Sequence, residues 1–128
     1  MRNDWQVGFN VWKHFIVDLN NVVFDKLTNL NESDIIMKLE NILKKNWFNV
    51  LWNKFHFFWW IESFTGIYLL SESHFSIHTW PELWYVSIDL FCCNFSNDYE
   101  KNMDISIDKV IEFLFNKDVS ISKKIINR

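Results

Sequence analysis

The chain has 128 residues, of which 49% are hydrophobic and 19% aromatic, with two glycines and one proline. This composition excludes a disordered protein, and the length suits one domain spanning residues 1–128. A net charge of −3 without a basic stripe argues against nucleic-acid binding, and no apolar stretch is long enough to cross a membrane. The start lacks the apolar region of a secretory signal, and the only cysteines, Cys92 and Cys93, are adjacent, so we expect a cytoplasmic protein without disulfides.

The first half of the chain predicts a strand, a helix and two more strands. Residues 5–19 are rich in Val, Phe, Trp and Ile, which favour a strand. A helix is expected from about Asn31 to Asn46, because Asn31 or Ser33 can cap it and apolar residues recur at helical spacing: Ile35, Leu39, Ile42 and Leu43. Residues 47–58 and 61–70 predict the next two strands.

The second half predicts two strands, a helix and a final strand. Residues 75–78 alternate in polarity until Pro81, and residues 85–91 alternate again, with Val86, Ile88 and Leu90 on one face. A helix is expected from about Ser106 to Asn116, and a strand over residues 119–126. This order of elements indicates the α+β class, a two-layer sandwich in which an antiparallel sheet carries helices on one face.

Residues 71–82 form the most specific pattern, Ser-Glu-Ser-His-Phe-Ser-Ile-His-Thr-Trp-Pro-Glu. The segment resembles the processing-site motif of the short prokaryotic S-adenosylmethionine decarboxylase proenzymes, which reads Ser-Glu-Ser-His, two residues, then Ile-His-Thr-Trp-Pro-Glu. Thr65-Gly66 resembles the family's upstream Ser-Gly pair. The family's downstream Tyr, Asp, Phe and Cys fall on Tyr85, Asp89, Phe91 and Cys93. The strong resemblance therefore covers residues 65–93.

The residue types at this motif suit self-cleavage. A serine hydroxyl can attack the carbonyl carbon of the residue before it when the backbone is held strained. The Glu72–Ser73 peptide would rearrange to an ester, and loss of the Ser73 α-proton would release Glu72 as a new C-terminus. The dehydroalanine left behind would hydrolyse to a pyruvoyl group and ammonia. The resemblance implies this maturation, which yields a β chain of residues 1–72 and an α chain of residues 73–128.

The resemblance also implies roles for the residues around the cleavage site. His78 matches the histidine that assists the elimination as a base, and Thr65 matches a serine whose hydroxyl steadies the intermediates. The pyruvoyl group made from Ser73 is an electron sink that forms a Schiff base with the substrate amine. Cys93 matches the proton donor of the decarboxylation. A thiol suits such a proton transfer.

Substrate contacts follow from the same resemblance. Glu82 resembles the residue that accepts hydrogen bonds from the substrate ribose hydroxyls. Phe58 or Trp59 lies where the family places an aromatic ring that stacks on adenine, although this aromatic run could equally belong to the core or an interface. Trp84 stands where the family commonly has glycine, and a bulky indole there could reshape the pocket.

The implied function is the decarboxylation of S-adenosylmethionine, which makes the aminopropyl donor for spermidine synthesis. No metal is expected, and the family implies a homodimer in which each active site draws residues from both protomers. One alternative keeps the pyruvoyl chemistry but acts on free ornithine or arginine. Another is a processing-dead regulatory homologue, against which the intact Glu72-Ser73, His78 and Cys93 argue. A zinc site is disfavoured because two adjacent cysteines seldom reach one tetrahedral metal.

Overall fold

The computed structural model describes residues 12–58, 62–71, 73–93, 99–115 and 118–127. Its strands and helices are, in chain order, β1 (Trp12–Asn20), α1 (Glu32–Lys45), β2 (Val50–Phe58), β3 (Ser63–Leu70), β4 (Ser73–Trp80), β5 (Tyr85–Cys93), α2 (Glu100–Leu114) and β6 (Ser120–Asn127). Two short 3-10 helices, η2 (Asp25–Asn29) and η3 (Pro81–Leu83), complete these elements. The predicted order of strands and helices is confirmed.

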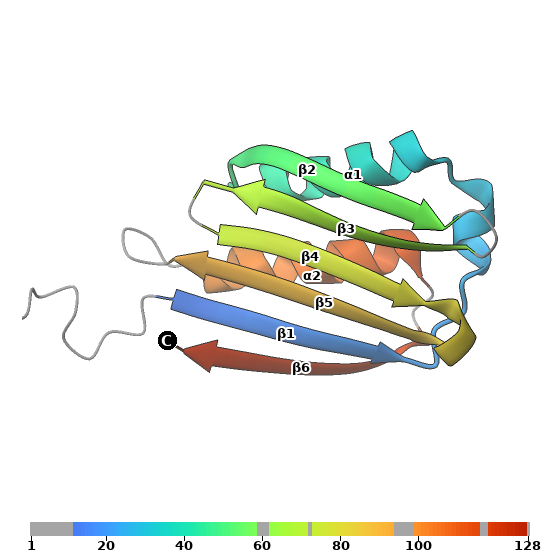
Figure 1. Cartoon of the computed structure of the whole chain (residues 1–128). Coiled ribbons are helices and arrows are strands. Elements are labelled where there is room, and N and C mark those ends of the chain that lie inside the picture. The colour runs from blue at the N-terminus through green and yellow to red at the C-terminus, as the bar shows by residue number, and fades with distance from the viewer. Residues whose placement is uncertain (1–11, 59–61, 72, 94–98, 116–117, 128) are drawn as a thin grey trace, which may run out of the picture.

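The strands form one six-stranded antiparallel sheet in the order β2-β3-β4-β5-β1-β6. Both long helices pack on the same face of this sheet, and the opposite face carries no helix within the described residues (Figure 1). The predicted two-layer α+β sandwich is therefore confirmed. Neither helix in the described ranges is long and apolar enough to span a membrane.

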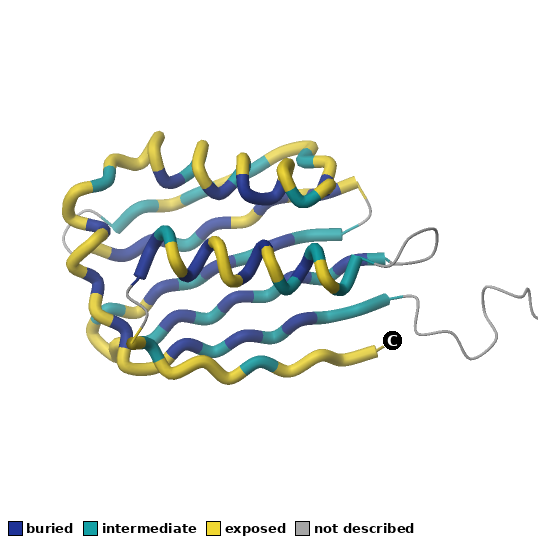
Figure 2. The backbone as a smooth tube through the Cα atoms, turned by 180° about the vertical axis from the view of Figure 1, so that it is seen from behind, coloured by how far each residue is buried: buried dark blue, intermediate teal, exposed yellow. Residues whose placement is uncertain are grey.

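The core lies between the sheet and the helices (Figure 2). The alternation expected for the fifth strand is confirmed, because Val86, Ile88 and Leu90 are buried while their neighbours are half-buried. The predicted apolar stripe of α1 is buried too, and the Asn31 side chain caps that helix by accepting a 2.8 Å hydrogen bond from the Asp34 amide. The alternate residues of the strands and the residues at helical spacing in α1 thus pack into one hydrophobic layer.

Three predicted boundaries are wrong. Strand β2 begins at Val50 rather than at residue 47, because Trp47 has a left-handed backbone in the turn after α1. Helix α2 begins at Glu100 rather than near Ser106, because Ser106 does not cap it and is fully buried inside it. Strand β4 runs from Ser73 to Trp80 and is longer than residues 75–78, since residues 73–78 pair with β3 and residues 74–80 pair with β5. The part of the first predicted strand before Trp12 lies outside the described residues.

Candidate active site

The predicted cleavage site lies at the tight connection between β3 and β4. Leu70 pairs with Ser73, so only Ser71 and Glu72 link the two strands. Glu72 is outside the described residues, whereas Ser71 is exposed and Ser73, the first residue of β4, is half-buried. The serine expected to become the cofactor therefore follows directly on a short hairpin link at one end of the sheet.

Cys93 lies at the same end of the sheet as Ser73. The register that pairs His74 with Phe91 brings the start of β4 beside the end of β5. Neither cysteine forms a disulfide among the described residues, but Cys92 belongs to the buried face and Cys93 alternates to the other, half-buried face. Ser73 lies on the same side of β4 as the buried Phe75, so it shares one end of the sheet with Cys93 but not the same face.

Thr65 and His78 form a second cluster. They are directly opposed across β3 and β4, and Thr65 Oγ1 is hydrogen-bonded to Nδ1 of His78. Both side chains are half-buried on the face of the sheet that no helix covers. The contact occupies one imidazole nitrogen and leaves Nε2 for chemistry, which is the arrangement that a histidine base needs.

The expected substrate-binding residues lie at the same end of the sheet as Thr65 and His78. Glu82 is exposed in the first turn of η3, directly after β4. Phe58 is half-buried at the end of β2, where it pairs with Ser63 and its ring meets the His56 ring edge-on at 4.6 Å. Trp59, the other candidate for adenine stacking, lies outside the described residues.

Strand β4 thus separates the predicted site residues into two groups. Five residue steps at about 3.3 Å each put roughly 16 Å between the α-carbons of Ser73 and His78. Cys93 lies near the serine, whereas Thr65, Glu82 and Phe58 lie near the histidine (Figure 1). The structure brings together the members of each group but does not bring the two groups together within one chain.

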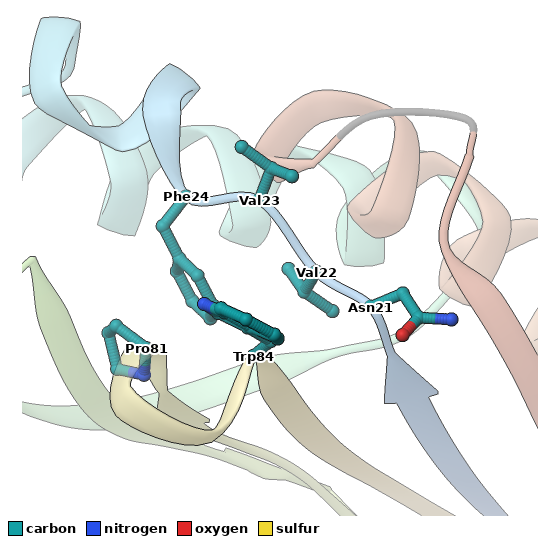
Figure 3. Close-up of a pocket in the computed structure, with 6 residues that line it drawn as sticks. All are labelled: Asn21, Val22, Val23, Phe24, Pro81 and Trp84. Carbon is teal, nitrogen blue, oxygen red and sulfur yellow. The ribbon is translucent and has the colours of Figure 1, made fainter.

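Trp84 shows why a glycine suits its position. Its backbone is left-handed, with φ of 52°, a region that bulky residues rarely occupy. The Trp84 amide donates a 3.1 Å hydrogen bond to Pro81, and its carbonyl accepts one of 3.0 Å from Val22. The indole lines a pocket beside the turn after β1. This pocket, of about 460 Å³, is shown in Figure 3 and is lined by Asn21, Val22, Val23, Phe24, Pro81 and Trp84.

The sequence pointed to Asp89 and Phe91 but did not predict their contacts with His14 and His74 in the middle of the uncovered face. His14 on β1 lies 3.2 Å from Asp89 on β5, and the His74 ring stacks on Phe91 with 5.6 Å between centroids. Burial lowers the pKa of His74, nearby His14 lowers it further and Asp89 opposes the shift. The alternation of polar residues along β1 and β4 was the available signal.

Metal binding finds no support among these groups. In the parts of the chain that the structure describes, no three His, Cys, Asp or Glu side chains are placed to hold a metal ion. Cys92 and Cys93 also face opposite sides of the sheet, which separates two ligands of the zinc site that the sequence already disfavoured.

Comparisons with known proteins agree with this geometry. The sequence model of the S-adenosylmethionine decarboxylase family matches residues 13–122. An S-adenosylmethionine decarboxylase proenzyme of Persephonella marina is 41% identical over 80 residues, which span 62% of this chain and 58% of that relative. One of Clostridium botulinum (strain Loch Maree / Type A3) is 36% identical over 89 residues, 69% of this chain and 73% of the relative.

A solved structure extends the similarity to the fold. The crystal structure of the adenosylmethionine decarboxylase from Aquifex aeolicus superimposes with a TM-score of 0.72 at 29% identity, covering 92% of this chain and 90% of that one. These matches place the chain in a class of lyases, the decarboxylases. The chain belongs to the S-adenosylmethionine decarboxylase family.

Proposed function

We propose that the chain is a self-processing S-adenosylmethionine decarboxylase whose pyruvoyl cofactor arises from Ser73. The observation that carries the proposal is the hydrogen-bonded pair of Thr65 and His78, which sets the family's processing residues side by side on adjacent strands. The names of the relatives and of the solved structure favour S-adenosylmethionine over free ornithine or arginine. They likewise favour an enzyme over a regulatory homologue.

Processing converts the hairpin link into two chain ends. Ser73 Oγ attacks the Glu72 carbonyl carbon, and the C–N bond breaks to leave an ester and a free Ser73 amine. His78 then removes the Ser73 α-proton, the electron pair forms a Cα=Cβ double bond, and the Glu72 carboxylate leaves with the Cβ–O pair. The dehydroalanine tautomerises to an imine, water adds, and ammonia departs to leave the ketone. The products are residues 1–72 and 73–128.

Turnover uses residues of both ends of the sheet. The pyruvoyl group supplies an electron sink for the charge left when the substrate carboxylate departs as carbon dioxide. The Cys93 thiol donates a proton to the substrate α-carbon, and the Glu82 carboxylate accepts hydrogen bonds from ribose hydroxyls. Phe58 or Trp59 stacks on adenine. The decarboxylated product is the aminopropyl donor for spermidine synthesis.

A homodimer follows from the length of β4. A general base must lie within about 3 Å of the proton that it removes. His78 lies about 16 Å along the strand from Ser73, so His78 of one protomer cannot serve Ser73 of the same protomer without unravelling the strand. A second copy, turned by a two-fold axis over the uncovered face, brings its own His78 to the first copy's Ser73. Each active site then contains both groups of residues.

The uncovered face of the sheet suits such a partner. Its β2–β3 region exposes the apolar side chains of Trp52, Ile67 and Leu69, which lie on the same face by the pairing of Trp52 with Leu69. Beyond β4, the contact of His14 with Asp89 at 3.2 Å gives the face a polar centre. Apolar and aromatic surface of this kind is typical of a subunit interface.

The maturation products would stay together without a covalent link. Strand β1, from the first product, lies between β5 and β6 of the second, and β3 pairs with β4 along six residue pairs from Thr65–His78 to Leu70–Ser73. The sheet thus interlocks the two chains. Two free cysteines fit a reducing cytoplasm as the site of this reaction.

One mass measurement tests the proposal. Denatured, fully matured protein should give two masses, those of residues 1–72 and 73–128, and the second chain should be lighter by one ammonia than the same chain beginning in serine. Hydrazine should label only that second chain, because it alone carries the ketone. Decarboxylation of S-adenosylmethionine should exceed that of ornithine and arginine. A single unbroken mass after prolonged incubation would overturn the self-processing function.

A further inference from the structure

Three rings form a continuous stack beside the processing pair. The His78 ring lies 5.8 Å from the Trp80 ring at an interplanar angle of 32°, and Trp80 stacks on Tyr85 at 5.4 Å and 27°. His78 and Trp80 share one face of β4 as alternate residues, and Trp80 pairs directly with Tyr85 across β4 and β5. The stack therefore runs along one strand and crosses to the next.

Both ends of the stack are fixed by hydrogen bonds. At one end, Thr65 on β3 holds Nδ1 of His78. At the other end, the Tyr85 hydroxyl donates to the Asp18 carboxylate on β1. This bond raises the pKa of Tyr85 to about 12, with burial and the charges of Asp18 and Asp89 adding to the shift, so the phenol stays protonated as a donor at neutral pH. We call Thr65, His78, Trp80, Tyr85 and Asp18 the aromatic clamp.

We propose that Trp80, Tyr85 and Asp18 are positioning residues that hold the His78 imidazole for the elimination step, an inference that rests on the proposed role of His78. An imidazole on a strand can turn about two side-chain bonds. Thr65 fixes one ring nitrogen, and the indole of Trp80 blocks rotation away from that contact. Tyr85, locked by Asp18, in turn keeps the indole from sliding along the uncovered face.

The clamp also defines which nitrogen acts. With Thr65 Oγ1 as acceptor, the proton of the neutral imidazole sits on Nδ1 and the Nε2 lone pair is free to take the Ser73 α-proton of the partner protomer. Displacement of a catalytic group by about 1 Å can slow a reaction a hundredfold. Loss of the clamp should therefore slow elimination and leave the earlier ester step unaffected.

The test separates the two steps with hydroxylamine. Wild-type protein is first shown to mature into two chains, so that failure of the proposed function is recognised before any variant is compared. Trp80→Leu should then mature about 10- to 100-fold more slowly and accumulate the ester. Hydroxylamine, which attacks esters, should split the accumulated ester into a Glu72 hydroxamate and a chain beginning with an unmodified serine amine.

Graded variants report on each part of the clamp. Trp80→Phe keeps a ring in the stack and should mature within a few-fold of the wild-type rate. Tyr85→Phe and Asp18→Asn remove only the hydrogen bond that anchors Tyr85, so their maturation rates should lie between those of Trp80→Leu and wild type. Trp47→Leu is the matched control, because that tryptophan is 79% exposed in the turn after α1. It should mature at the wild-type rate.

Two outcomes would overturn the clamp. One is wild-type maturation of both Trp80→Leu and Tyr85→Phe in a protein whose wild-type form self-cleaves. The other is slow maturation of Tyr85→Phe with no accumulation of an ester that hydroxylamine can cleave. The delay would then precede ester formation, and the stack would support the fold or the first step instead of positioning the His78 base. Tyr85→Phe keeps every ring and so decides the question even if Trp80→Leu does not fold.

Discussion

The two ends of β4 are built in different ways. At the start of the strand, Ser73 follows a two-residue link and is held mainly by the backbone ladder to Leu70. At the far end, His78 is held by side chains, a threonine hydroxyl on one side and an indole ring on the other. The chain can therefore be cleaved before Ser73 without disturbing side-chain packing. A proton transfer by His78, in contrast, needs a side chain that is held in place.

If His78 is the base that acts on Ser73, as proposed, the distance between the two ends of β4 requires two copies of the chain. A β-strand is stiff and gains about 3.3 Å per residue, so two groups at its ends cannot meet. In a two-fold dimer with antiparallel facing strands, however, the start of one β4 lies over the end of the other. Ser73 and His78 then act together because they are far apart in one chain.

Mixing two inactive variants tests this arrangement with the largest expected effect. Ser73→Ala alone should remain one chain without activity, and His78→Ala alone should not mature. Co-expressed, they form heterodimers in which one site combines an intact Ser73 with an intact His78. Random pairing should then restore about a quarter of the wild-type active sites, each on a cleaved His78→Ala chain. Absence of any cleaved chain in the mixture would mean that the two residues act within one protomer.

Cys93→Ala probes the serine end after maturation. Because the thiol is expected to donate a proton only during turnover, the variant should still give two chains, but its decarboxylation rate should fall about 10²- to 10⁴-fold. Cys92→Ala is the control, since that neighbour faces the buried side of the sheet. Equal rates for wild type and Cys93→Ala, measured as carbon dioxide release, would remove Cys93 from the reaction.

Thr65 variants probe the histidine end. Thr65→Val keeps the shape but removes the hydroxyl, which leaves His78 Nδ1 without its partner. Losing such a hydrogen bond corresponds to roughly 1.5–3 kcal/mol, so maturation should slow by about one to two orders of magnitude. Thr65→Ser keeps the hydroxyl and should mature within a few-fold of wild type. If Thr65→Val and Thr65→Ser mature at the same rate in a time course followed by mass spectrometry, the Thr65 hydroxyl has no role in maturation.

Much of the fold could be predicted because its elements carry regular patterns. Alternation identified β5 from Val86, Ile88 and Leu90, and the stripe and cap of α1 identified that helix. The start of α2 could not be predicted, since Tyr99 at its N-cap makes no side-chain capping bond and Ser106 mimics a cap while lying in the helix interior. The Ser106 hydroxyl is buried without a hydrogen-bond partner among the described residues.

The sequence predicted the individual site residues but not their positions relative to one another. The motif named Ser73, His78, Thr65 and Cys93, whereas their division between two ends of the sheet depends on strand pairing. The anchor of Tyr85 on Asp18 joins side chains 67 positions apart, and no local pattern reports such a contact. The ion pair of Lys123 on β6 with Asp104 of α2 likewise joins residues that no local pattern connects.

A substitution in the helix layer should have the smallest effect on maturation, because it does not touch either end of β4. Asn31→Ala removes the side chain that caps α1, and such a loss lowers the free energy of unfolding by about 1 kcal/mol. The helices lie on the face opposite Thr65 and His78, so maturation should proceed at the wild-type rate below the melting temperature (Figure 2). Asn31→Asp, which can still accept the Asp34 amide hydrogen, should retain most of the stability. Slower self-cleavage of Asn31→Ala in native buffer would mean that the helix layer takes part in aligning the strand ends.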